Sequence, residues 1–402
     1  MTPPAAGQSP AGIAVLLAAL TAIGAFSVDA YLPSLHDIGD TFHASPIEVQ
    51  QTLTAYLFMF SLMSLWHGAI SDAIGRRRVI LVSLVVFMLA SIGCLFATRI
   101  EHLWLLRGVQ GFSACAGAVV SRAIVRDIFV GPAAQRLMSH IAMMFAIAPA
   151  VAPVIGGQLQ SAFGWHSIFI FLALMGGALW AACAWRLPET LPPAQRRSLH
   201  PIYLAKAYAK TLTSPAFLLA TGSLACNFGG FFIYIMSAPT FLIHHLGLPE
   251  TGFLWLFGPS MCGLVSGAWL SGRLAGRLSP KRTIALGYAV MTIAVILNLG
   301  VSFLLAPGLP WSVLPMPFYT LGMSLTMPSM SLLALDMFPR QRGLASSCQM
   351  FLQSLSNSVV AGVAAPAAWA STHSLAAAMG AFMAIGALCA LLHFRCPHTP
   401  EH

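Results

Sequence analysis

The chain has 402 residues and carries very little charge for its length. Hydrophobic residues make up 58% of it and charged residues 8%, against about 25% charged residues in soluble domains. So few charged side chains cannot cover a water-exposed surface, which excludes a soluble fold. The formal net charge of +9 would suit a nucleic-acid-binding protein. Its distribution, described below, instead favours basic loops that orient a membrane protein, and we expect no nucleic acid partner.

Twelve apolar segments are long enough to cross a bilayer, which takes about 20 residues in a helix. The sequence therefore predicts an all-α integral membrane protein of twelve transmembrane helices. Residues 1–10 contain no Lys or Arg, so the first segment is interpreted as a membrane helix and not as a signal peptide. The predicted segments are 11–33, 48–71, 79–98, 102–124, 137–162, 166–187, 215–243, 250–271, 283–305, 312–335, 343–370 and 374–394.

A polar stretch at 188–214 separates the sixth segment from the seventh and predicts two halves. We expect an N-terminal six-helix bundle at 1–190, a cytoplasmic linker at 191–214 with a surface helix near 201–211, and a C-terminal bundle at 215–402. The halves resemble a repeat, because GAISDAIGRRRVI at 68–80 matches GRLAGRLSPKRTI at 272–284. Two such halves around a site near the bilayer midplane are a known transporter plan, in which one half rocks against the other.

The basic residues lie almost entirely on one side of the predicted bundle. With both termini on the same side, the loops of that side hold 18 of the 20 Lys and Arg residues. The other side holds Arg99, and Arg107 lies within a segment. By the positive-inside rule this asymmetry places both termini in the cytoplasm and supports the count of twelve.

One acid and one base lie inside the predicted membrane segments. Asp29 is four residues from the outer end of the first segment, and Arg107 is five residues from the outer start of the fourth. At a rise of 1.5 Å per residue, both would lie about 6–8 Å below the outer interface. A carboxyl in an apolar setting holds a proton more readily. Our hypothesis is that Asp29 binds a coupling proton and that Arg107 tunes it or competes with substrate; a purely structural ion pair is the alternative.

Uncharged polar residues inside the segments are candidates for a substrate site. On the eleventh segment they recur at helical spacing and form one polar stripe, which can either line a cavity or bind neighbouring helices. Methionine and tyrosine can adapt an apolar pocket to varied ligands. The predicted substrate-binding residues are Gln51, Tyr56, Gln110, Asn227, Tyr234, Met236, Gln349, Gln353 and Asn357.

Several motifs together resemble the major facilitator superfamily (MFS). The loop Gly68–Arg78 is similar to the family's signature loop, although it has Ala73 where the family often has Arg. LLRGVQG in the fourth segment is similar to the family's basic motif, and PAVAPVIGG at 149–157 resembles a proline–glycine motif associated with antiporters. SVDAYLP at 27–33 and SRAIVRDIF at 121–129 are similar to the Bcr/CflA drug-resistance branch.

The resemblance implies gating residues and a mode of transport. Asp72, Arg76 and Asp127 would form a charge cluster that locks the outward-facing state, with Asp72 facing the eleventh segment near Gly343; incidental pairing of topogenic charges is the alternative. The other implied gating residues are Gly75, Pro153, Gly156 and Gly157. It further implies a proton-coupled antiporter of the bacterial inner membrane, a probable monomer in the lipid bilayer, that exports small, largely apolar compounds such as drugs.

Other functions stay open or are disfavoured by the sequence. A metabolite transporter of the same superfamily, for example an amino acid exporter, remains an alternative because Arg107 can bind one carboxylate. An enzyme or receptor would need a catalytic constellation or a large extramembrane domain, and neither is evident. No phosphate-binding loop, HExxH motif or CxxC pair occurs, so we expect no catalytic residue, no metal and no cofactor.

Overall fold

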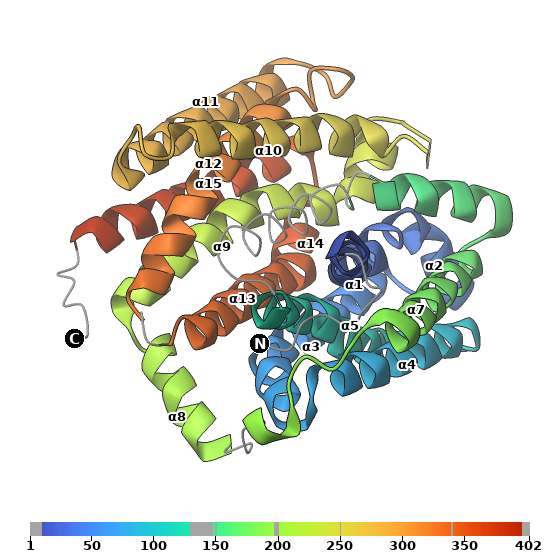
Figure 1. Cartoon of the computed structure of the whole chain (residues 1–402). Coiled ribbons are helices and arrows are strands. Elements are labelled where there is room, and N and C mark those ends of the chain that lie inside the picture. Colours follow the sequence, from blue (N-terminus) through green and yellow to red (C-terminus); the bar gives the residue numbers. More distant parts are fainter. Residues whose placement is uncertain are drawn as a thin grey trace. The chain divides into compact units, whose positions relative to one another are not determined.

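The computed structural model describes residues 10–128, 148, 151–196, 201–249, 251–338 and 341–395. Within these ranges the regular elements are all helical, and the one β-type contact is an isolated bridge between Ala275 and Leu278. The chain divides into two compact units, Met1–Pro201 and Ile202–His402 (Figure 1). The dividing point falls inside the stretch 191–214 that separates the two predicted bundles.

The first unit contains the elements up to the linker. A 3₁₀ turn, Leu32–Ser34, connects its first two helices, and a helical stretch over 151–163 precedes its last one. Half of the predicted fifth segment, 137–162, lies outside the described residues. The helices are α1 (Pro10–Asp29), α2 (Leu35–Phe42), α3 (Pro46–Ile74), α4 (Arg76–Leu95), α5 (Ile100–Ile128) and α7 (His166–Arg186).

The second unit begins with a short helix, α8 (Pro201–Leu212), which confirms the surface helix predicted near 201–211. Two π-helical turns interrupt its longer helices, at Thr240–His245 after α9 and at Val360–Ala364 after α13. Its other helices are α9 (Pro215–Met236), α10 (Leu254–Leu274), α11 (Pro280–Leu304), α12 (Pro315–Asp336), α13 (Arg342–Val359), α14 (Ala365–Ala368) and α15 (Thr372–Arg395).

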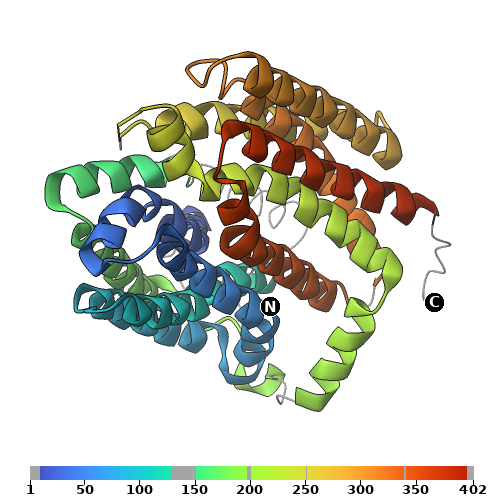
Figure 2. The same cartoon turned by 180° about the vertical axis from the view of Figure 1, so that it is seen from behind.

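The two units repeat the same packing pattern. In the first unit α5 packs on α1, α3 and α4, and α7 packs on α1 and α4. In the second unit α12 packs on α9, α10 and α11, and α15 packs on α9 and α11. Figure 2 shows α9 and α15 running side by side in the second unit. Matching α1, α3, α4, α5 and α7 with α9, α10, α11, α12 and α15 therefore maps one set of contacts onto the other.

Local signals in the sequence explain where several helices begin. Ser45 caps α3 by accepting a hydrogen bond from the Glu48 backbone amide, and the Glu48 carboxylate accepts one from the Ser45 backbone amide. This reciprocal capping box, followed by Pro46 at the first helical position, fixes the start of α3. At the start of α11, the Ser279 side chain accepts a hydrogen bond from the Arg282 backbone amide, and Pro280 occupies the first helical position.

Nine helical segments among the described residues are long and apolar enough to cross a membrane. One of them, Gly12–Phe42, combines α1, the 3₁₀ turn and α2. The first predicted segment, 11–33, ends within the 3₁₀ turn that connects α1 to α2. Pro33 lies within the 3₁₀ turn, where a missing amide hydrogen is tolerated, so the chain continues as helix beyond it.

Candidate functional site

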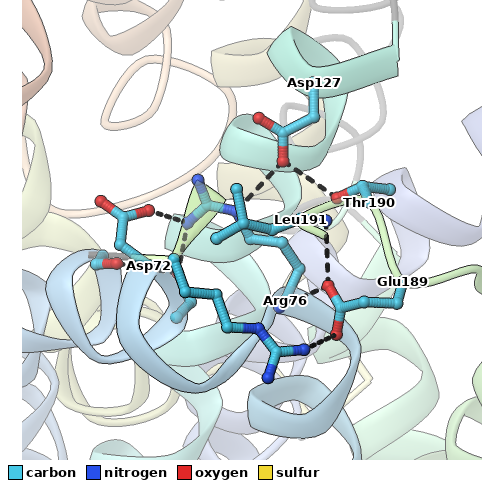
Figure 3. Close-up of polar contacts among 9 residues, drawn as sticks. Asp72, Arg76, Asp127, Glu189, Thr190 and Leu191 are labelled. Atoms are coloured by element: carbon cyan, nitrogen blue, oxygen red, sulfur yellow. Dashed lines mark hydrogen bonds and ion pairs between the residues drawn. The ribbon is translucent and has the colours of Figure 1, made fainter. Parts of the chain in front are cut away.

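A cluster of charged side chains surrounds Arg76 at the junction of α3 and α4 (Figure 3). The Arg76 guanidinium lies 2.5 Å from the Asp72 carboxylate and 3.1 Å from that of Asp127. The Arg76 residue is 8% exposed, so these ion pairs are better shielded from water than ordinary surface pairs. The three residues whose clustering the family resemblance implied are thus in contact within the first unit.

Glu189, which follows α7, completes this cluster. Its carboxylate accepts hydrogen bonds from the backbone amides of Arg76 at 2.9 Å and Leu191 at 3.1 Å, and it lies 4.0 Å from the Arg196 guanidinium. Thr190 donates to Asp127 at 2.9 Å. The segment after α7 therefore ties the start of α4 to the end of α5 (Figure 3). Glu189 was not among the predicted gating residues, although it directly follows the sixth predicted segment, 166–187, in the sequence Pro188-Glu189-Thr190.

Gly75 makes the close approach of Glu189 possible. Its φ of 107° lies in a region that residues with a side chain rarely adopt, and a Cβ atom there would collide with the Glu189 carboxylate. The backbone amide of the next residue, Arg76, can then point at that carboxylate. A glycine is thus required at this position of the loop for two independent steric reasons.

Replacement of Glu189 with alanine is expected to destabilise the first unit by about 1–3 kcal/mol, because two backbone amides lose their common acceptor. Glu189→Gln keeps a side-chain oxygen for those amides and loses only the ion pair with Arg196, so we expect it to recover most of the loss. The stability of both variants is measured by unfolding the purified protein with a denaturing detergent. Equal destabilisation by Gln and Ala would contradict the role assigned to the amide hydrogen bonds.

A second polar site surrounds Arg107, which is fully buried two turns into α5. Its guanidinium donates to the Ser27 carbonyl at 2.9 Å and to the Gln110 side-chain oxygen at 2.7 Å. The rings of Tyr31 and Tyr56 lie against it, with centroids 4.6 and 4.7 Å from the guanidinium carbon. Aromatic faces and carbonyl oxygens stabilise a buried cation without neutralising it.

The two tyrosines and Gln110 are themselves held in place by neighbouring helices. The Tyr31 hydroxyl accepts from Thr52 at 3.0 Å, and the Tyr56 hydroxyl donates to the Gly24 carbonyl at 3.2 Å. Gln110 donates to Ser91 of α4 at 2.7 Å. The Arg107 site therefore joins α1, α3, α4 and α5. The predicted residues Tyr56 and Gln110 are in this site, where they contact Arg107.

Asp29 is buried at the last residue of α1, but it does not pair with Arg107. The described residues include no ion pair between Asp29 and Arg107, and Arg107 bonds instead to the backbone two residues before Asp29. Because the Arg107 guanidinium reaches the Ser27 carbonyl, it lies at the Asp29 end of α1, and the equal depth of the two charges in the membrane stays a prediction. The two charges thus lie on contacting helices, α1 and α5, without a direct salt bridge.

The proline–glycine motif packs directly beside Asp29. Pro153, Gly156 and Gly157 are all buried. A Cβ atom on Gly156 would collide with the carbonyl of Ala30, the residue after Asp29. The backbone of this helical stretch therefore rests on the chain at the Asp29 end of α1.

Two polar residues of α9 have partners inside the second unit. Asn227 donates to the Tyr288 hydroxyl at 2.9 Å, and the Tyr234 hydroxyl accepts from Asn298 at 2.8 Å. Both residues are buried, as is Met236. These bonds join α9 to α11, which is the helix–helix alternative for polar residues in a span. Their role as substrate contacts stays a prediction.

The polar stripe of α13 is half-buried. Gln349 and Ser331 of α12 exchange hydrogen bonds at 3.0 and 3.2 Å, whereas the Gln353 amide nitrogen lies 3.5 Å from the Asn357 side-chain oxygen. Gln51 of α3 is also half-buried. Gln349 therefore contributes to packing between α12 and α13. The other three remain predicted substrate contacts.

Comparisons with known proteins identify the fold family. Residues 16–361 match the model of the Major Facilitator Superfamily. The chain belongs to the major facilitator superfamily. It is 31% identical to an uncharacterized MFS-type transporter, YdgK, of Bacillus subtilis (strain 168), over 96% of each chain. It is 28% identical to a bicyclomycin resistance protein homolog of Haemophilus influenzae, over 82% of this chain and 83% of the relative.

A solved structure supports the same fold. The crystal structure of a D-xylose–proton symporter aligns with a TM-score of 0.76 at 15% identity, covering 96% of this chain and 98% of the other. This likeness concerns the fold alone. The predicted all-helical MFS fold is confirmed, and so is the resemblance to the drug-resistance branch. The chain is a multi-pass membrane transporter of small molecules and not an enzyme.

Proposed function

We propose that this MFS transporter is a proton-coupled antiporter that exports small, largely apolar compounds such as drugs by alternating access. The observation that carries the proposal is the burial of Asp29 and Arg107 on contacting helices without an ion pair between them. An acid held in an apolar bundle without a salt bridge can change its protonation state during a transport cycle. The proline–glycine motif packed beside Asp29 and the drug-resistance relatives support antiport and export.

The orientation in the membrane is part of this proposal. Both termini would lie in the cytoplasm of a bacterial cell, which the 18 basic residues on one side support, and the protein would act as a monomer in the inner membrane. The Arg76 cluster then lies on the cytoplasmic face. Its ion pairs would hold that face closed in one state and break in the other, which assigns gating to Asp72, Arg76 and Asp127.

Substitution of Asp29 with asparagine is expected to reduce proton-driven exchange by about tenfold or more, because the amide cannot bind and release a proton. The exchange of a labelled substrate is measured in everted membrane vesicles with an imposed proton gradient. Asp40→Asn is the matched control, since the Asp40 side chain is 74% exposed on α2. Undiminished exchange by the Asp29→Asn variant would contradict the proposed coupling role.

A second candidate function is export of a metabolite that carries one carboxylate, such as an amino acid. The favouring observation is that the buried Arg107 guanidinium has no carboxylate partner among the described residues and that its Nε atom has no hydrogen-bond partner. A susceptibility panel with and without expression, repeated with a proton uncoupler, separates the two functions. Resistance that the uncoupler abolishes supports drug export, and unchanged susceptibility to every compound favours the metabolite.

A further inference from the structure

The loop between α10 and α11 carries a group of exposed basic side chains. We define the basic patch as Arg273, Arg277, Lys281 and Arg282, all of which are exposed in the second unit. Arg395, at the end of α15, is exposed as well. The Lys281 ammonium lies 5.6 Å from the ring centroid of the neighbouring Phe394, so α15 ends beside the patch. This places five cations at one end of three helices.

The patch differs from the equivalent loop of the first unit in having no acidic partners. Arg76 in the first unit is bound by Asp72, Asp127 and Glu189. The offset of 204 residues between the two matching loops (272 minus 68) places Gly276 at the position of Asp72 and His393 at that of Glu189, whereas Asp127, near the end of α5, has its counterpart in Asp336 at the end of α12. The second loop has therefore kept its cations, while two of the three acids are replaced by residues without negative charge and the third, Asp336, pairs with Arg342 outside the patch.

Few other acids are available to neutralise the patch. The sequence after residue 201 contains three acidic residues, Glu250, Asp336 and Glu401. Asp336 is paired with Arg342 at 2.7 Å. In the part of the chain that the structure describes, no ion pair involves the basic patch. An anion from outside the chain is thus the natural counter-charge.

The surroundings of the patch fit a ligand at the membrane surface. The Arg273 guanidinium stacks at 4.0 Å on the ring of Trp269, which is 57% exposed. Tryptophan at a helix end is typical of the level of lipid headgroups. The patch also includes the start of α11, a 25-residue helix whose positive dipole end favours an anion. A headgroup phosphate would meet cations, a helix start and an interfacial aromatic side chain together.

We propose that the basic patch binds the headgroup of an anionic phospholipid in the cytoplasmic leaflet. The proposal rests on the orientation given under Proposed function, because the patch lies on the side assigned to the cytoplasm. Charge that serves only to orient the protein would explain the sign of these residues. It would not explain why the acid of the matching loop, Asp72, is replaced by Gly276 or why Arg273 and Lys281 lie on aromatic rings.

Lipid retention by the full-length protein tests the proposal. The purified protein is exchanged into micelles that contain equal amounts of phosphatidylglycerol and phosphatidylethanolamine with identical acyl chains, and bound lipids are counted by native mass spectrometry. We expect the wild type to retain about threefold more phosphatidylglycerol, or better. The variant Arg277→Gln, Lys281→Gln, Arg282→Gln should lose that preference. A matched triple variant, Arg78→Gln, Arg186→Gln, Lys206→Gln, removes the same charge from exposed positions predicted to lie on the same side and should keep it.

Several outcomes would overturn the proposal. Equal loss of preference in both triple variants would show that bulk charge, and not this patch, attracts the lipid. Displacement of the lipid by millimolar inorganic phosphate would identify a soluble phosphate ligand instead. Labelling of Ser279→Cys in intact cells, in a background without other accessible cysteines, reports the orientation separately. A wrong orientation and an absent lipid site are therefore distinguishable, and neither readout depends on transport.

Discussion

Replacement of Arg107 with methionine is expected to lower proton-driven exchange by about tenfold or more while the protein stays folded. Methionine is a flexible apolar side chain that adapts to irregular space, and the described partners of Arg107 are uncharged, so its removal leaves no buried unpaired carboxylate among them. The loss of transport would follow from removing the one cation that contacts Ser27, Gln110 and the two tyrosines. Exchange in everted vesicles and the thermal midpoint of the purified protein are the two measurements.

Arg107→Lys is the informative companion variant. A lysine keeps the charge but cannot donate to the Ser27 carbonyl and the Gln110 oxygen in the planar geometry of a guanidinium, nor stack between two rings as well. We therefore expect Lys to recover only a minor part of the lost exchange. Full exchange by the Met variant would show that Arg107 serves packing alone. Full exchange by the Lys variant would show that charge suffices and that the cage of hydrogen bonds is dispensable.

The Gly156→Val substitution is expected to disturb both stability and coupling. Its side chain would collide with the Ala30 carbonyl, and overpacking of this kind costs about 1–3 kcal/mol. Because Ala30 follows Asp29, relief of the collision must move the end of α1 that carries the acid. We expect a lower thermal midpoint together with a shifted pH profile of exchange. A general packing defect would lower the midpoint alone, so the shifted pH profile is the effect that reports on Asp29.

The control for this substitution is Gly300→Ala in α11. Nothing lies within 4 Å of a Cβ atom at that position. Alanine stabilises the interior of an exposed helix by about 1 kcal/mol relative to glycine. The control should therefore be neutral or slightly stabilising and should leave the pH profile unchanged. If Gly156→Val lowered stability but left the pH profile of exchange as in the wild type, the result would contradict an influence of Gly156 on Asp29.

Much of the fold could be predicted because a bilayer imposes a simple rule on sequence. Every segment that crosses it needs about 20 apolar residues, and most predicted boundaries lie within a few residues of the helices observed, as for 166–187 and α7 (His166–Arg186). At the outer end of the first segment, 11–33, the path is less regular, because α1 ends at Asp29 and a second helix follows. Pro33 marks a helix end when only local propensity is considered, yet a 3₁₀ turn absorbs it and helix resumes through α2.

The candidate site was harder to predict because its contacts use groups with no sequence signature. The backbone carbonyl of Ser27 accepts from Arg107 whatever side chain residue 27 carries. The sequence suggested Asp29 as a partner of Arg107 because both lie inside predicted segments, although the structure shows no ion pair between them. The hydrogen bonds of Asn227 and Tyr234 to α11 were not predicted, because the rotation of α9 about its axis cannot be read from its own sequence. Their partners, Tyr288 and Asn298, are polar residues of α11 and were the signal that was missed.

The repeated packing pattern has a consequence for how the chain is made. Each unit encloses its own set of helix contacts, and the joint between them falls after Pro201. Synthesis proceeds from the N-terminus at roughly 5–20 residues per second, and domains generally fold as units. The helices of the first unit can therefore complete their mutual contacts, including the hydrogen bonds that Glu189 makes to the start of α4, before α15 leaves the ribosome. This transporter then assembles in two successive folding steps, one for each copy of the repeated helix arrangement. The charged segment after α7 completes the first step.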